Sequence, residues 1–214
     1  MLGSDSEQYD LNTVAEKACR ELADGGFLDD SSIPLTVMGF SFGSSIALDI
    51  CILLEKDYSF SVHQFIPLAW PAVHSFPIHL KHVLRSKPGR SYIMKHLIKS
   101  SGGESFQKSQ TKAKFLTKEN MKILSQFAEH AMAHKRPLHP PLTCPIISFQ
   151  AYQDLFSIVA NLYRPLTRPH RLQREWARYT TSQTDLILLE GGHFFPFDSR
   201  KCSSFYSKLL IAIN

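Results

Sequence analysis

Apolar and polar positions follow two different periods along the chain, and the switches between them predict alternating helices and strands. Apolar residues recur at helical spacing over residues 11–22, and the pair Gly25-Gly26 would end this helix. The short apolar run 33–38 is typical of a buried parallel strand. Residues 44–56 are rich in Ala, Ile and Leu at helical spacing, and they predict a second helix directly after the strand.

The rest of the chain repeats this alternation after a long polar interruption. A second strand is expected over 62–68, whereas residues 77–139 are polar and charged and predict a helical insertion. Further strands are expected over 145–149 and 184–190, and further helices over 173–179 and 203–213. Strands that alternate with helices indicate a parallel α/β sheet. At 214 residues the chain suits one domain, residues 1–214, with the insertion inside it.

Composition excludes several classes of protein. The apolar fraction of 43% and the charged fraction of 20% are ordinary for a globular protein. The longest apolar run, 46–54, is too short for a bilayer and contains Asp49, so we expect no membrane span. The polar N-terminus does not resemble a signal peptide. The four cysteines are scattered without a CxxC pair, which predicts reduced, mostly buried thiols in a cytoplasmic protein and no metal site.

The chain carries a formal charge of +5, which raises the question of an acidic partner. Basic residues gather over 81–99 and 164–174, but no nucleic-acid-binding motif accompanies them, so we expect no nucleic-acid partner. A basic surface would steer an acidic protein toward the chain. A solvated face with a small surplus of Lys and Arg explains the same composition.

The segment Gly39-Phe40-Ser41-Phe42-Gly43 matches the GxSxG pattern of a nucleophile elbow, and its context supports that interpretation. A predicted strand precedes it and a predicted helix follows it. Gly39 and Gly43 would allow strand and helix to approach closely, so that the turn lifts the Ser41 hydroxyl clear of the sheet. The Phe42 N–H would then point at a developing oxyanion. The alternative is a glycine-rich turn without catalytic meaning.

A serine nucleophile needs a base, and the base needs an acid to orient it. In proteins with such an elbow, the acid precedes the histidine in the chain. His193 follows the predicted strand 184–190, and Asp154 follows the strand 145–149, so both lie at carboxyl ends. Asp185 lies at the wrong end of its strand, and Asp198 follows the histidine. We therefore predict Ser41, His193 and Asp154 as the catalytic residues; a plain loop carboxylate at 154 is the alternative.

Several segments resemble the type II thioesterases, which are stand-alone α/β-hydrolases serving fatty-acid, polyketide and nonribosomal peptide synthases. The likeness extends from about residue 11 to the C-terminus. The carrying segments are MGFSFGSSIAL from residue 38, SGG from residue 101, LTCPI from residue 142, EWARYT from residue 175 and GGHFF from residue 191. The last of these matches the family's most specific short signature.

The resemblance implies an α/β-hydrolase fold with a helical lid at 77–139. It also implies hydrolysis of acyl thioesters on an acyl or peptidyl carrier protein that bears phosphopantetheine. Ser41, Asp154 and His193 would be the catalytic residues, and the Phe42 N–H would bind the oxyanion. Neither a cofactor nor a metal is required, and we expect a monomer.

The sequence also departs from the family pattern. Phe40 stands where the family usually has His, Phe42 replaces Met, and Gln150 and Ala151 replace two glycines before the acid. Residues 161–170 look like an insertion. Nothing between residues 1 and 33 resembles the glycine-rich loop that supplies the second oxyanion N–H in this fold, so we expect an N-terminally short domain. The alternatives are another serine esterase or lipase, and a weakly active homologue that binds a carrier or an acyl chain.

Overall fold

A computed structural model describes residues 11–70, 86, 88, 140–152, 154, 175–198 and 202–213. Three α-helices lie in the described residues: α1 (Leu11–Asp24), α2 (Gly43–Asp57) and α10 (Cys202–Ile213). The strands are β1 (Thr36–Phe40), β2 (Gln64–Leu68), β3 (Ile146–Ala151) and β4 (Thr184–Leu189). A single 3₁₀ turn, η2 (Phe195–Phe197), lies between β4 and α10.

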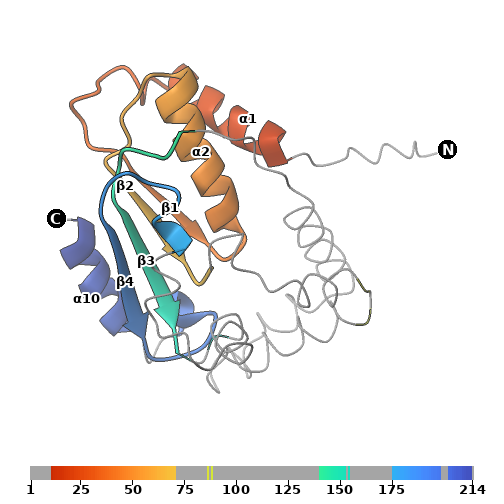
Figure 1. Ribbon diagram of the computed structural model, residues 1–214, viewed down its shortest axis with the longest axis vertical. Helices are drawn as coiled ribbons and strands as arrows, with labels where there is room; N and C mark the ends of the chain where they lie inside the picture. The colour runs from red at the N-terminus through yellow and green to blue at the C-terminus, as the bar shows by residue number, and fades with distance from the viewer. Residues whose placement is uncertain are drawn as a thin grey trace.

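The four strands form one parallel sheet in the order β1-β2-β3-β4 (Figure 1). β1 and β2 end opposite each other at Phe40↔Leu68, and β3 and β4 end opposite each other at Ala151↔Leu189. The second pair extends two residues further, because Leu68 pairs with Phe149. The parallel α/β sheet predicted from the sequence is therefore confirmed. Because the strands are parallel, the segments that follow them lie at one edge of the sheet, where open α/β sheets place their sites.

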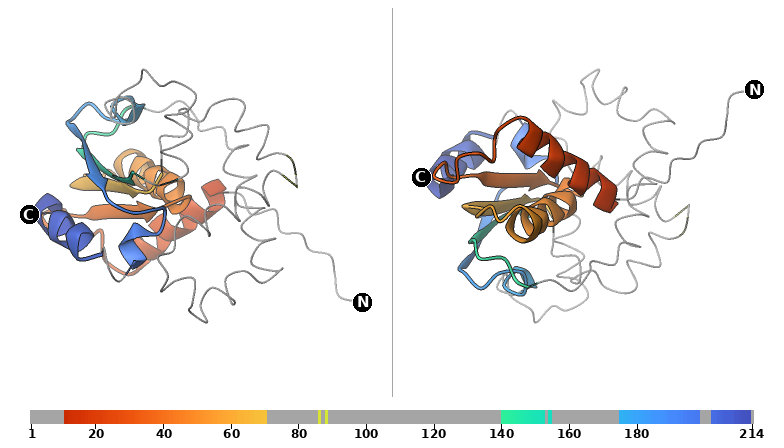
Figure 2. Two further views of the ribbon diagram at one scale, coloured as in Figure 1. Left: turned by 90° about the horizontal axis from the view of Figure 1, so that it is seen from below. Right: turned by 90° about the horizontal axis from the view of Figure 1, so that it is seen from above.

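Two apolar cores lie on opposite faces of the sheet. Successive strand residues point to opposite faces, so Phe65 of β2 joins the core beneath α2 while its neighbour Ile66 joins the core beneath α10. All five residues of β2 are buried, because β1 and β3 flank it and helices cover both faces. Helix α1 packs against α2, and the two lie alongside each other in every view (Figures 1 and 2).

The first predicted strand was wrong in its bounds and in its burial. The strand begins at Thr36 and continues to Phe40, whereas Ile33 lies in a turn and is 61% exposed. The ladder to β2 sets these limits, because it starts at Thr36↔Gln64 and ends at Phe40↔Leu68. Only β2 pairs with β1 among the described residues, so Met38 is half exposed although the strand was expected to be buried.

The other predicted elements fall on observed ones or outside the described residues. The helices expected over 11–22, 44–56 and 203–213 and the three later strands are confirmed to within two residues. Of the helix expected over 173–179, residues 175 and 176 are helical and residues 177–179 form a turn. The helical insertion 77–139, apart from Ser86 and Pro88, and the insertion 161–170 lie outside the described residues. None of the described helices is long and apolar enough to cross a membrane.

Three cysteines lie inside the core between α1, α2 and the sheet. Cys19, Cys51 and Cys144 are buried, as predicted, whereas Cys202 is half-buried at the start of α10. Burial raises the pKa of Cys19 to about 11 and that of Cys144 to about 12, with smaller contributions from Asp57 and Glu55 respectively. Burial also raises the pKa of the Cys51 thiol. These three side chains are therefore neutral thiols near neutral pH.

We expect the three buried thiols to resist alkylation in the folded protein. The thiolate is the reactive species, and a thiol with a pKa of about 11 is ionised to roughly one part in a thousand at pH 8. Iodoacetamide at pH 8 followed by intact mass measurement should show fast labelling of Cys202 alone, and labelling of all four after unfolding. Fast native labelling of a Cys202→Ser variant would contradict this arrangement.

Candidate active site

The backbone at Ser41 forms a strained turn between β1 and α2. Ser41 has a φ of 53°, which lies in the left-handed region that residues other than glycine rarely adopt. Its N–H donates to the Leu68 carbonyl over 2.7 Å, and its carbonyl accepts from the Ser44 N–H over 2.9 Å. The turn is thus tied to β2 on one side and to the first turn of α2 on the other. This is the geometry expected of a nucleophile elbow.

The elbow depends on a very close approach of β1 and α2. A Cβ added at Gly39 would lie 2.4 Å from the Ser44 Cα, so no larger residue fits there. The Ser44 hydroxyl reinforces the contact by donating to the Gly39 carbonyl over 2.7 Å. At Gly43, by contrast, no described atom lies within 4 Å of an added Cβ. The expectation that both glycines are needed for the approach is right for Gly39 and wrong for Gly43, which lies on the open side of the turn.

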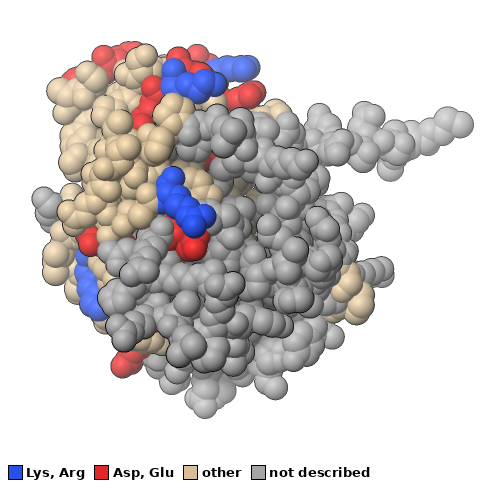
Figure 3. Space-filling model, viewed as in Figure 1, with Lys and Arg blue, Asp and Glu red and all other residues tan. Residues whose placement is uncertain are grey.

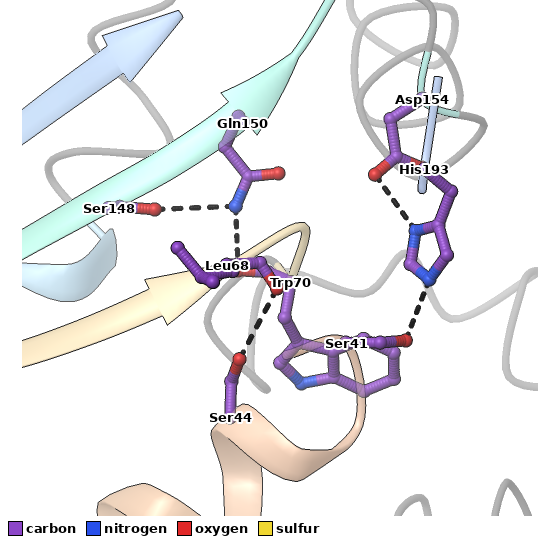
Figure 4. A network of polar contacts seen from close by, with 8 residues as sticks. All are labelled: Ser41, Ser44, Leu68, Trp70, Ser148, Gln150, Asp154 and His193. Carbon is purple, nitrogen blue, oxygen red and sulfur yellow. Dashed lines mark hydrogen bonds and ion pairs between the residues drawn. The ribbon is translucent and has the colours of Figure 1, made fainter. Parts of the chain in front are cut away.

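His193 joins the two other predicted side chains (Figure 4). Its Nε2 lies 2.7 Å from the Ser41 Oγ, and its Nδ1 lies 3.0 Å from an Asp154 carboxylate oxygen. Asp154 is fully buried and His193 is 3% exposed, so both polar groups are removed from water and paired with each other. Asp154 follows β3 and His193 follows β4, and those strands are neighbours in the sheet.

Aromatic rings enclose the imidazole of His193. The Phe40 ring centroid lies 5.3 Å from it and the Phe194 centroid 5.2 Å from it, the second in an edge-to-face arrangement. Phe197 packs edge-on against Phe40. Of the two phenylalanines expected to shield the histidine from water, Phe194 contacts the ring, whereas Phe195 points into the core and anchors the loop from beneath.

Asp185 and Asp198, two aspartates that were not predicted to be catalytic, lie in other parts of the structure. Asp185 is the second residue of β4 and pairs with Ile147, at the opposite end of the sheet from Ser41. Asp198 follows η2, and its carbonyl accepts from the Cys202 N–H at the start of α10. The structure places Asp154 3.0 Å from the His193 Nδ1, as predicted for the orienting acid.

Phe42 occupies the position expected for an oxyanion donor. It is the N-cap residue of α2, where helix N–H groups lack partners within the helix itself. The positive end of the helix dipole also lies there, and it favours negative charge. The ring of Phe42 packs edge-on against Trp70, with centroids 6.0 Å apart.

Two residues at this edge were not assigned a role from the sequence. Trp70 is the second residue after β2, and Gln150 is the penultimate residue of β3. Both are buried, and the Gln150 side-chain amide donates to the Trp70 carbonyl over 2.8 Å (Figure 4). Their places at the carboxyl ends of neighbouring parallel strands were the available signal. For Gln150, the sequence shows only a glutamine where the resembled family usually has a glycine.

The described part of the chain also bears on the predictions about metal ions and acidic partners. There, no group of three or more His, Cys, Asp or Glu side chains is placed to hold a metal ion. Lys and Arg atoms lie beside Asp and Glu atoms on the face shown in Figure 3. Lys17 pairs with Glu21 one turn along α1, over 3.9 Å. The basic stretches 81–99 and 164–174, apart from Ser86 and Pro88, fall outside the described residues. A basic docking surface therefore remains a prediction.

Comparison with known proteins identifies the fold. No protein-family model and no curated protein sequence matches the chain. Solved structures do match, among them the RedJ thioesterase of the prodiginine pathway in Streptomyces coelicolor (18% identity, TM-score 0.68). The type II thioesterase BorB of the borrelidin cluster (17%, 0.57) and human thioesterase 2 (15%, 0.57) match as well.

These matches cover nearly all of this chain and a smaller share of each matched protein. The chain is covered to 93%, 93% and 92% in the three comparisons, and it spans 66% of RedJ, 72% of BorB and 79% of the human protein. At such low identity the likeness shows the fold. The chain therefore has the α/β-hydrolase fold that the motif resemblance implied.

The contrast between Gly39 and Gly43 gives a direct test of the elbow. Gly39→Ala should lower the free energy of unfolding by about 3 kcal/mol, because the new methyl group meets backbone that cannot move independently. Gly43→Ala, at the first residue of α2, should leave it unchanged or raise it by about 0.5–1 kcal/mol. Urea unfolding of both variants measures the difference, and equal stabilities would contradict the close approach.

Proposed function

We propose that this chain is a serine hydrolase that cleaves acyl thioesters held on the phosphopantetheine arm of an acyl or peptidyl carrier protein. The observation that carries the proposal is the continuous pair of hydrogen bonds from Ser41 through His193 to Asp154 at the carboxyl edge of the sheet. Nucleophile, base and orienting acid are within direct hydrogen-bonding distance, which is the arrangement that acyl transfer requires. The thioesterase fold of the matched structures supports the substrate class.

The first half of the reaction forms an acyl-enzyme. The Ser41 Oγ attacks the thioester carbonyl carbon while His193 Nε2 accepts the hydroxyl proton. The Asp154 carboxylate accepts the Nδ1–H, which holds the imidazole in the required tautomer and stabilises its protonated form. The carbonyl oxygen becomes an oxyanion, which the Phe42 N–H stabilises. The C–S bond then breaks, and the leaving thiolate takes the proton from His193.

The second half releases the acid. Water donates a proton to His193 Nε2 as its oxygen attacks the acyl carbon. The tetrahedral intermediate collapses, the bond to the Ser41 Oγ breaks, and the serine recovers its proton from His193. The products are a carboxylic acid and a carrier with a free thiol. Side-chain groups of this chain and water supply every proton in the cycle.

Ring packing around His193 supports the same role. Phe40 and Phe194 limit the positions that the imidazole can adopt, because each ring lies about 5 Å from it. A base held between rings stays within reach of both the nucleophile and the leaving group through the two proton transfers. Rigid positioning of this kind lowers the entropic part of the barrier.

Replacement of the nucleophile tests the activity itself. Ser41→Ala should lower kcat on an acyl-phosphopantetheinyl carrier protein by roughly 10⁴-fold or more, because the acyl-enzyme forms on the Ser41 hydroxyl. A fluorophosphonate probe should label the original protein and not the variant, as measured by intact mass. Turnover unchanged by the substitution would contradict the proposal.

Substrate class is tested with the same protein. An acyl thioester and its matched oxygen ester should both be hydrolysed, with the thioester faster at equal chain length. A large preference for the oxygen ester would assign the chain to another class of serine esterase. Labelling by the probe without turnover of either ester, beside measurable binding of the carrier, would indicate a binding homologue.

Asp154→Asn tests the orienting acid. The amide preserves the shape of the buried side chain, but it removes the negative charge and favours the wrong imidazole tautomer, so kcat should fall by about 10³–10⁴-fold. Asp185→Asn is the matched control, since this carboxylate lies at the other end of the sheet, and it should leave kcat within twofold. Thermal unfolding measured on both variants separates a loss of chemistry from a loss of fold.

A further inference from the structure

We infer that Trp70 is a positioning residue for the oxyanion donor, and that Gln150 holds Trp70 in place; this inference rests on the proposed function above. Neither side chain belongs to the Ser41–His193–Asp154 series. Both lie beside it at the carboxyl edge, where Figure 4 shows the Gln150 amide of β3 joined to the Trp70 carbonyl in the segment after β2. Their role would be to fix the peptide unit that follows the nucleophile.

Trp70 contacts the first turn of α2 at two points. Its indole N–H donates to the Ser45 hydroxyl over 3.0 Å, and its ring packs edge-on against the ring of Phe42. The Ser45 N–H in turn donates to the Phe42 carbonyl over 2.9 Å. Phe42 is thus restrained through its ring and through its carbonyl. Its N–H lies in the preceding peptide unit, whose Ser41 carbonyl accepts from the Ser44 N–H, so the two restraints act on the N–H through the Phe42 Cα that joins the two units.

The backbone before Trp70 is held in an unfavourable conformation that directs the side chain onto α2. Ala69 has a φ of 52°, in the left-handed region, and its N–H donates to the Phe149 carbonyl over 2.8 Å. Such a conformation is unfavourable for a residue with a Cβ. It persists only where the surrounding contacts over-determine it. Ser41, with a φ of 53°, is the other strained residue at this edge.

Gln150 supplies the contact that retains this conformation. Its side-chain amide donates to the Trp70 carbonyl over 2.8 Å and lies 3.3 Å from the Ser148 hydroxyl. The residue is 1% exposed, so loss of this donor would leave a carbonyl without its partner in a site from which water is excluded. The glutamine that replaces a family glycine therefore joins β3 to the tryptophan, and through it to the oxyanion turn.

The kinetic signature of this role is specific. The oxyanion exists only after the nucleophile attacks, so a misdirected Phe42 N–H weakens the transition state and leaves binding of the thioester unchanged. Loss of an oxyanion donor lowers kcat by about 10²–10³-fold, and loss of its alignment should remove part of that. We expect Trp70→Phe to lower kcat by about 10-fold with KM within twofold. Affinity for a trifluoromethyl ketone that forms a hemiketal with Ser41 should fall in parallel.

The chain contains a matched control for this substitution. Trp176 is the second of its two tryptophans and is 1% exposed, and among the described residues its buried indole N–H has no hydrogen-bond partner. It packs against Phe65 in the core beneath α2, away from Ser41. Trp176→Phe should therefore leave kcat within twofold, whatever it does to stability. A tenfold loss of kcat in both variants would overturn the inference.

A double-mutant cycle tests the path from Trp70 to Phe42. Ser45→Ala removes the same hydrogen bond with a smaller change of volume, so it keeps the test informative if Trp70→Phe unfolds. Its kcat should fall by a similar factor, and the double variant should lose no more than Trp70→Phe alone, because both changes break one link. Gln150→Met should give the same change in kcat at constant KM.

The outcomes separate this inference from the proposed function. If Ser41→Ala abolishes hydrolysis while Trp70→Phe and Ser45→Ala keep full kcat, the hydrolase stands and the positioning role is wrong. A rise in KM alone would likewise overturn it, since that result assigns Trp70 to substrate binding. If Ser41→Ala retains full activity, the proposed function fails first.

Discussion

The contact between Gly39 and Ser44 is the constraint on which the rest of the site depends. Helix α2 begins so close to the end of β1 that a single methyl group would collide with its backbone. This approach forces the chain through the left-handed conformation at Ser41 and directs the hydroxyl outward. It also places the first turn of α2, with Phe42 and Ser45, within reach of the segment that follows β2.

The site also depends on hydrogen bonds between its buried polar groups. Asp154 and His193 are almost completely removed from water, which is unfavourable unless each is hydrogen-bonded. Neighbouring parallel strands with level ends make the pairing possible, because Ala151 lies opposite Leu189. Gln150 follows the same rule, since its buried amide finds a partner in the Trp70 carbonyl. Two series of hydrogen-bonded polar groups thus lie at one edge of the sheet. Each group is hydrogen-bonded to a neighbour in its own series.

The core beneath α10 contributes to the site from below. Phe205 of α10 packs edge-on against Phe149 of β3 and against Phe195 of η2, at centroid distances of 5.5 and 5.3 Å. The loop that carries His193 is therefore anchored to the strand that leads to Asp154 by way of a single buried ring. Burial of apolar groups is non-directional, but the edge-to-face packing of these three rings fixes where the loop lies.

The sequence by itself determined the order of the described helices and strands, because hydrophobic period is a local signal. It also predicted Ser41, Asp154 and His193 as site residues from a glycine-flanked serine and the strand ends, and the structure brings these three side chains together. It also identified the strand ends that must share one edge. It misplaced the start of β1, since the pairing with Gln64 that begins the strand involves residues distant in the chain.

Tertiary structure decided which glycine permits the close approach, which phenylalanine faces the imidazole, and what Trp70 and Gln150 do. No local pattern distinguishes Gly39 from Gly43, because both flank the serine equally in sequence and only the three-dimensional path of α2 brings Ser44 onto the first. The bond from Gln150 to Trp70 spans eighty residues. Contacts of that range depend on strand register and helix approach, which arise when the whole sheet assembles.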